Sequence, residues 1–182
     1  MKRLIHVLCG YLLFACLLLA SPVKPSAASS VPGYSENQVK AAFITHLFSF
    51  IDWPKEAPRY VLCATEDSPL VSVITELVNA KPALALTVRV MDPADVSQAT
   101  CHALIVDNRA TSGATSVVDI AQIGLLTIGD APGFAKQGGM IELERRPSRI
   151  GLIVNLTATQ KAGFQVSSKL LRLATIIESE GA

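Results

Sequence analysis

The stretch YVLCATEDSPLVSVITELVNAKPALALTVRVM, residues 60–91, predicts a strand, a helix and a second strand in immediate succession. Residues 60–64 are apolar and of strand length, and Val88 and Val90 alternate with polar residues within the second strand, predicted over 85–91. Ser68 and Pro69 signal the start of the intervening helix, predicted over 69–79. Two successive strands joined by a helix run parallel, so this stretch predicts an α/β fold.

The chain on either side of this stretch extends the same pattern. Apolar runs at 102–106 and 125–128 predict two more strands, with a weakly helical segment at 116–122 between them. Upstream, Ser35 and Gln38 form a capping box, and Pro54 is expected to end the first helix after Trp53. The apolar positions expected on the inward face of that helix are Val39, Ala42, Phe43, Leu47, Phe50 and Ile51.

The last third of the chain departs from the parallel pattern. Strands predicted at 140–143 and 150–156 are joined by a connection too short for a crossover helix, so they should form an antiparallel hairpin. A short helix is expected at 157–162, closed by Gly163, and Ser167 should cap a final amphipathic helix over 168–177. The prediction is a single α/β domain: a mostly parallel sheet flanked by helices, ending in this hairpin and a C-terminal helix.

The N-terminus resembles a secretory leader. Lys2 and Arg3 precede an apolar run at 11–20, and small residues end at Ala28, which is the layout of a cleavable signal peptide over 1–28. Cleavage would remove Lys24 together with Lys2 and Arg3. The expected mature domain, residues 29–182, then carries 13 basic residues against 15 acidic ones. Export to the periplasm is expected, and nucleic acid is an unfavourable partner for a chain without basic excess.

Two cysteines remain after the leader, Cys63 and Cys101. An isolated even pair in an oxidising compartment favours a disulfide between them, and two buried free thiols are the alternative. Two distant cysteines without histidines at ligand spacing do not form a metal site. His46 and His102 are interpreted as structural residues, because the sequence has no nucleophile elbow, phosphate loop or dinucleotide fingerprint. Neither a catalytic residue nor a cofactor is predicted.

Two segments are candidates for binding. The glycine loop, residues 129–139, directly follows a strand, where α/β folds commonly bind ligands. It is alternatively a structural turn, with Asp130 capping one helical turn and Phe134 filling the core. The arginines 145, 146 and 149 flank the hairpin turn, where they either meet an acidic partner or discourage edge-to-edge strand pairing. Trp53 is either a buried corner or an exposed anchor for a partner.

Five collinear motifs give the chain a family resemblance. NQVKAAF at 37–43 with FIDWP at 50–54 resembles the opening motif of the YfiR family, and CHALI at 101–105 resembles its central cysteine strand. TIGDAPGFA at 127–135 with GGMI at 138–141 is similar to its glycine loop. VNL at 154–156 and AGFQVSSKLLRLA at 162–174 are similar to its closing strand and last helix.

The resemblance implies a periplasmic regulator rather than an enzyme. YfiR-like proteins are known as repressors that bind the periplasmic sensor domain of an inner-membrane diguanylate cyclase, and so control cyclic-di-GMP signalling and biofilm formation. An outer-membrane-associated protein can sequester the repressor. A second disulfide known near the glycine loop has no counterpart here, since no cysteine follows Cys101. The alternative is a periplasmic small-ligand sensor that works with a sensor kinase or an outer-membrane receptor and has its pocket between the glycine loop and the start of the last helix.

The candidate residues fall into two groups, one for binding and one for supporting the fold. A second copy of the chain is a further candidate partner. The partner surface is expected over 134–177, apart from the first helix. Candidates for binding a partner or ligand are Asp130, Phe134, Gly138, Gly139, Arg145, Arg146, Arg149, Gln165 and Ser167. Residues expected to support the fold at the family motifs are Phe43, Trp53, Pro54, Asn155, Leu170 and Leu171.

Overall fold

Seven strands form the central sheet of the computed structural model, which describes residues 33–64, 68–97, 99–106 and 124–178. The parallel part pairs β3 (Leu86–Val90), β2 (Tyr60–Ala64), β4 (Ala103–Val106) and β5 (Leu126–Gly129) in that order. Beyond β5 lie β6 (Ile141–Arg146), β7 (Arg149–Asn155) and β9 (Thr175–Ile177). Within this sheet only β6 and β7 pair antiparallel, which confirms the predicted α/β class and its hairpin.

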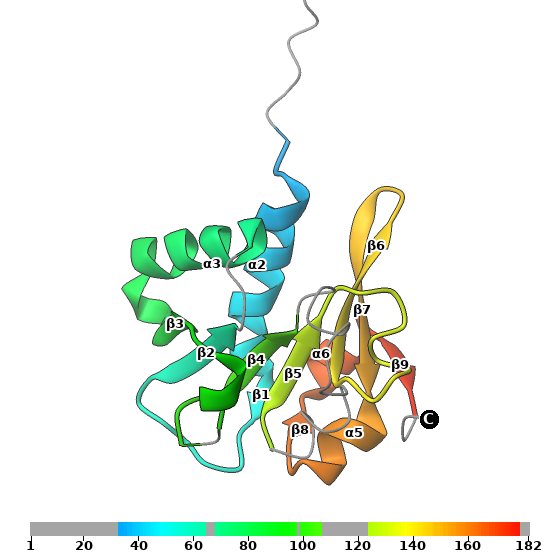
Figure 1. The fold of residues 1–182 in the computed structure, drawn as a ribbon. Helices are drawn as coiled ribbons and strands as arrows, with labels where there is room; N and C mark the ends of the chain where they lie inside the picture. The colour runs from blue at the N-terminus through cyan, green and yellow to red at the C-terminus, as the bar shows by residue number, and fades with distance from the viewer. Residues whose placement is uncertain (1–32, 65–67, 98, 107–123, 179–182) are drawn as a thin grey trace, which may run out of the picture. The chain divides into compact units, whose positions relative to one another are not determined.

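Two helices lie side by side along the sheet: α2 (Glu36–Leu47) and α3 (Pro69–Ala80) (Figure 1). Both begin as the sequence predicts. The Ser35 hydroxyl accepts from the Gln38 N–H, the Gln38 side chain accepts from the Ser35 N–H, and Ser68 caps α3 ahead of Pro69. Short 3-10 turns follow at η2 (Phe48–Phe50), η3 (Pro82–Leu84) and η4 (Pro93–Asp95). The helix predicted at 116–122 lies outside the described residues.

The period-2 alternation of each strand divides the apolar residues between the two faces of the sheet. Leu62 and Ala64 of β2 belong to the larger core, together with Ile44 of α2 and Ile74 of α3. Cys63, between them in β2, belongs to a smaller cluster on the opposite face with Cys101, Leu104, Val106, Leu125, Ala131 and Phe134. Cys63 and Cys101 are joined by a disulfide, with their Cα atoms 5.8 Å apart. The predicted bridge is thereby confirmed.

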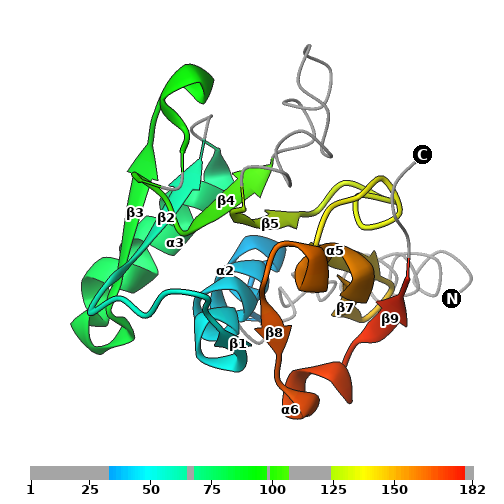
Figure 2. The same cartoon turned by 90° about the horizontal axis from the view of Figure 1, so that it is seen from below.

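A second, two-stranded sheet joins distant parts of the chain (Figure 2). Its strands are β1 (Ile51–Asp52) and β8 (Gln165–Val166), which pair antiparallel. Trp53 follows β1 and is half-buried between aromatic rings, with centroids 4.6 Å from Tyr60 and 5.2 Å from Phe48. Its indole N–H donates to the Phe48 carbonyl at 3.1 Å. The Trp-Pro motif therefore forms a packed corner.

The chain after β7 differs from the prediction. Helix α5 (Leu156–Lys161) is capped by Asn155 and ends before Gly163, which adopts φ +83°, so its bounds are close to those predicted. Helix α6 (Ser168–Leu171) starts at the Ser167 cap but is a single turn, and a helix reaching residue 177 was wrong. Residues 175–177 instead form β9 beside β7, because a β-branched Thr-Ile-Ile segment gains more from strand pairing than from a solvent-facing helix.

The inward face predicted for α2 was also wrong in part. Its buried residues are Lys40, Ala41, Ile44, Thr45 and Leu47, and only the last of these was expected. Val39 and Ala42 are half-buried, and Phe43, expected to support the fold, is 37% exposed. The helix carries two apolar stripes; α3 and the sheet cover one of them, and the other faces outward.

Candidate partner-binding surface

The glycine loop is closed around one aromatic ring. Phe134 is 1% exposed, and a Cβ at Gly129 would lie 2.7 Å from its ring. A Cβ at Gly139 would overlap the same ring, whereas Gly138 adopts φ +97°, a conformation that favours glycine. One glycine of the pair is thus required for space and the other for backbone conformation.

Buried polar side chains hold the loop in place. The backbone N–H groups of Gly133 and Ala135 donate to the two carboxylate oxygens of Glu142, at 3.0 and 2.9 Å. Asn155, fully buried, donates to the Ala135 carbonyl at 2.9 Å and accepts from the Ala158 N–H at 3.0 Å, so it also caps α5. The arrangement is that of a structural turn with Phe134 in the core.

Asp130 does not cap this turn as expected. Its carboxylate accepts a hydrogen bond from Lys40 Nζ at 2.8 Å, and Lys40 also pairs with Glu36 at 2.7 Å. Glu36 in turn pairs with Arg145 at 3.2 Å. Four charged side chains thus link the glycine loop, α2 and the hairpin, and the hairpin does not lie apart from the first helix.

These four linked charges stabilise each other. The hydrogen bond from Lys40 lowers the pKa of Glu36, with burial opposing and the nearby cations assisting. For Lys40, burial alone would lower the pKa, but its hydrogen bonds to Asp130 and Glu36 outweigh burial and raise it. A lowered carboxyl pKa contributes stability that is present above the ordinary value of 4.5 and is lost as the pH falls through the folded-state value.

Glu36→Gln is therefore expected to lower the free energy of unfolding by about 0.5–1 kcal/mol at pH 7, because solvent screens its ion pairs. The deficit relative to wild type should begin to shrink at pH 3.5, because below the ordinary pKa of 4.5 the unfolded wild type takes up a proton at Glu36, and the folded state follows at lower pH. Urea unfolding at both pH values measures it. Glu56→Gln, at an exposed loop position, is the control and should show no deficit at either pH. An equal deficit at both pH values would contradict the assignment.

The distal half of the hairpin extends past its neighbours (Figure 1). Strand β6 pairs with β5 only at Ile141 and Glu142, and β7 pairs with β9 only from Ile153 onward. Residues 149–152 of β7 therefore form a sheet edge, as predicted. From Ile153 onward β9 pairs with β7 and forms the edge instead. This arm of paired strands carries the three arginines beside its turn.

The three arginines have different environments. Arg146 binds Glu144 at 2.5 Å and donates to the Thr175 hydroxyl at 3.2 Å, and its guanidinium covers Gly151, where a Cβ would lie 2.5 Å from Nε. Arg145 holds Glu36 with a side chain that is still 79% exposed. Arg149 is exposed, and its side chain makes no ion pair or hydrogen bond with the described part of the chain. Arg146 stabilises the hairpin, and the other two are available to a partner.

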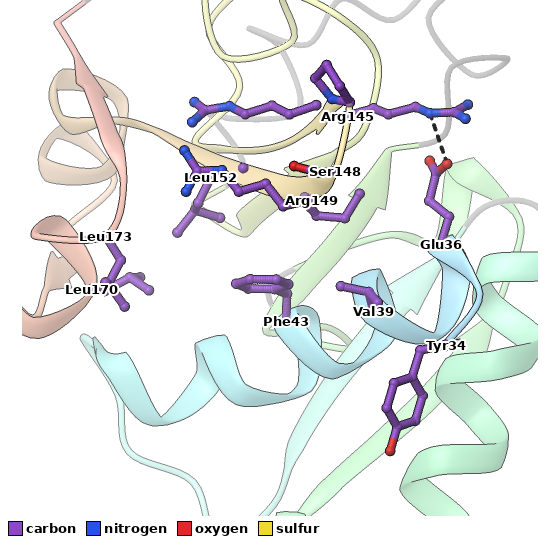
Figure 3. A pocket seen from close by; sticks show the side chains of 14 residues that line it. Tyr34, Glu36, Val39, Phe43, Arg145, Ser148, Arg149, Leu152, Leu170 and Leu173 are labelled. Atoms are coloured by element: carbon purple, nitrogen blue, oxygen red, sulfur yellow. Dashed lines mark ion pairs between the residues drawn. The ribbon is translucent and has the colours of Figure 1, made fainter. Parts of the chain in front are cut away.

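A groove of about 650 Å³, the hairpin groove, lies between the arginines and α2. Figure 3 shows Val39 and Phe43 of α2 facing Leu152 and Arg149 of the hairpin, with the Arg145–Glu36 ion pair at one end. Leu170 and Leu173 lie at the opposite end (Figure 3). The groove therefore has an apolar floor and a cationic rim.

A second groove of about 840 Å³, the helix groove, lies between α2 and α3. Apolar side chains of both helices line it, among them Ala42, Leu47, Val73 and Leu77. The two grooves share five lining residues and so form one continuous surface: Tyr34, Val39, Phe43, Leu170 and Leu173. Tyr34 is 86% and Leu173 79% exposed, so large apolar side chains stand uncovered at this surface.

The remaining predicted residues lie elsewhere. Ser167 caps α6, and its N–H donates to the Phe50 carbonyl at 2.9 Å. Gln165 is exposed and pairs with Asp52 across the two-stranded sheet. His102 accepts from the Val61 N–H through Nδ1 at 3.0 Å, and burial lowers its pKa, which fits a structural histidine. The hairpin groove reaches Leu170 and Leu173 near the last helix, but no residue of the glycine loop lines it.

Sequence reasoning missed most of the α2 side of this surface. Tyr34, Glu36 and Val39 were not recognised as residues of this surface. Leu173 was predicted only as part of the final helix. The signal was present: α2 has too many apolar residues for one inward stripe. An outward apolar stripe beside a basic hairpin turn would have located the grooves.

Within the described ranges, no cluster of three or more histidine, cysteine, aspartate or glutamate side chains is placed to hold a metal ion. None of the helices in those ranges combines the length and apolar character needed to span a bilayer.

Comparison with known proteins supports the resemblance seen in the motifs. No curated protein matches the chain. A family model described as YfiR/HmsC-like matches residues 37–175, which include every strand and α-helix described above except the first residue of α2 and the end of β9. That family is known for periplasmic regulatory proteins rather than enzymes. Because the match covers well over half of its length, the chain belongs to the YfiR/HmsC-like family.

Proposed function

We propose that this protein is a periplasmic repressor that binds the periplasmic sensor domain of an inner-membrane diguanylate cyclase. The observation that carries the proposal is the continuous apolar surface with Arg145 and Arg149 at its rim, in a member of a regulatory family. Exposed apolar patches bounded by polar residues mark sites of protein interaction. The expected N-terminal signal peptide over 1–28 would deliver the protein to the same compartment as the sensor domain.

Repression follows from a difference in affinity. The protein binds the inactive state of the sensor more tightly than the active state, and so shifts the sensor population toward inactivity. A coupling of about 1–3 kcal/mol changes activity roughly 5- to 150-fold, which is a working range for a switch. An outer-membrane-associated protein that competes for the repressor would relieve the block.

Charge reversal at the rim tests this proposal. Arg145→Glu/Arg149→Glu is expected to raise cyclic-di-GMP in the native host toward the level of the deletion strain, because an acidic partner surface would be repelled. Arg146 is left unchanged because it stabilises the hairpin through Glu144 and Thr175. Cyclic-di-GMP, protein level by immunoblot and the Tm of the purified variant are measured together.

The matched control reverses two charges away from the grooves. Lys55 and Arg89 are exposed, neither lines a groove, and Arg89 lies on β3, at the opposite edge of the sheet from β9. Lys55→Glu/Arg89→Glu should repress normally. Normal repression by the Arg145→Glu/Arg149→Glu variant, at normal protein level, would contradict a role for the rim. Unchanged cyclic-di-GMP on deletion of the gene would contradict repression itself.

A small-ligand sensor working with a sensor kinase or an outer-membrane receptor is the second candidate. The hairpin groove, at about 650 Å³, is within the usual size range of small-molecule sites, and its arginines would suit an anion. Thermal shift of the purified protein against a panel of anionic metabolites tests it. A ligand-induced rise in Tm that is lost in Arg145→Glu/Arg149→Glu would favour this candidate.

A further inference from the structure

The two grooves together match the dimensions of a short helix. Helix α2 lines one groove or the other from Glu36 to Leu47, which is 12 residues or about 18 Å at 1.5 Å per residue, and its Val39 and Phe43 line both. A helix lying along it would contact the surface over about three turns. Peptide helices bind such grooves through side chains at i, i+3, i+4 and i+7. The exposed side chains of Tyr34, Phe43 and Leu173 line both grooves and offer apolar contacts to such a stripe.

The charge at the hairpin end is one-sided. Arg149 is exposed without an ionic partner in the described residues, and the Arg145 pair with Glu36 leaves its side chain 79% exposed. Surface pairs of this kind contribute little, so a carboxylate from another molecule can share Arg145 with Glu36. The occupant of the groove is therefore expected to carry acidic side chains at the hairpin end and an apolar stripe beyond it.

A second copy of this chain does not have such a helix among its described elements. The acidic residue of helix α2 is Glu36, which is already paired with Lys40 and Arg145, and that of α3 is Glu76. Helices α5 and α6 carry lysines and no acidic residue. Charge complementarity thus favours a different protein over a homodimer at this surface.

We propose that the continuous groove docks an acidic amphipathic helix, about three turns long, of the protein's membrane partner. The inference rests on the proposed function, because it specifies the partner segment that the repressor contacts. The apolar stripe of the docked helix lies along α2 against Val39, Phe43 and Leu173, and its carboxylates meet Arg145 and Arg149.

Site-specific photocrosslinking in the native host tests the proposal. The probe p-benzoylphenylalanine replaces Phe43 in the groove or, as the control, Val90, which is 51% exposed on the far edge strand β3. Crosslinked peptides are identified by mass spectrometry, and cyclic-di-GMP is measured in the same cells. The expected result is a crosslink from position 43, not 90, to an acidic amphipathic helix of the membrane signalling protein. Its yield should fall about tenfold in the Arg145→Glu/Arg149→Glu background.

Each other outcome overturns the inference. Crosslinks from position 43 to a second copy, to this chain's own N-terminal residues, or to a loop or strand of the partner would identify a different occupant. Intact repression without any crosslink at position 43 would place the partner elsewhere and leave the proposed function standing. If deleting the gene leaves cyclic-di-GMP unchanged, the proposed function fails, whatever position 43 contacts.

Discussion

Phe134→Ala is expected to lower the free energy of unfolding by about 3–5 kcal/mol, the range for removing a fully buried aromatic ring. The ring is 1% exposed and lies against Gly129 and Gly139, so its loss leaves a cavity under the ends of β5 and β6. Glu142 and Asn155 fix the loop backbone around it and prevent the loop from collapsing into that cavity. Urea unfolding followed by circular dichroism measures the change.

Gly139→Ala tests the same packing from the opposite side. Its methyl group would overlap the Phe134 ring, and overpacking of this kind costs about 1–3 kcal/mol. In the double variant Phe134→Ala/Gly139→Ala the methyl has room, so the combined loss should be clearly less than the sum of the two single losses. Gly33→Ala, with no atom within 4 Å of the added Cβ, is the control and should be neutral. Additive losses would show that the two residues do not contact each other.

The sequence was sufficient wherever a local pattern decides the structure. The run at 60–91 folds as a strand, a helix and a strand, because alternation and helix capping are both encoded within it. Ser35, Gln38 and Gly163 act at helix ends as their residue types suggest. The structural alternative for the glycine loop could also be stated in advance, although its polar contacts with Glu142 could not.

The failures occurred where contacts distant in sequence decide between local alternatives. Apolar side chains over 168–177 have a helical spacing, but β7 supplies an edge that pairs with residues 175–177 as a strand. On α2, Lys40 is buried because Asp130, 90 residues away, supplies a carboxylate beside it. Neither partner is visible from local periodicity, and in the second case the error hid the outward stripe that lines the candidate surface.

Removing the disulfide is the second change with a large expected effect. Cys63→Ala/Cys101→Ala should lower the free energy of unfolding by about 4 kcal/mol, the chain-entropy value for a bridge across a sequence separation of 38. The bridge ties the central strand β2 to the residues just before β4, and both cysteines are buried, so the reduced wild type should lose a similar amount. Urea unfolding with and without reductant measures both, and the double variant should not respond to reductant.

The position of the bridge also predicts what its loss leaves intact. Cys63 and Cys101 lie on the face of the sheet opposite α2 and α3, away from Arg145, Arg149 and both grooves. A Cys63→Ala/Cys101→Ala protein that remains folded in the host should therefore still repress, once its lower level is corrected by immunoblot. Two titratable thiols in the denatured, non-reduced wild type would contradict the bridge. Loss of repression at matched level would instead show that the bridge face takes part in binding.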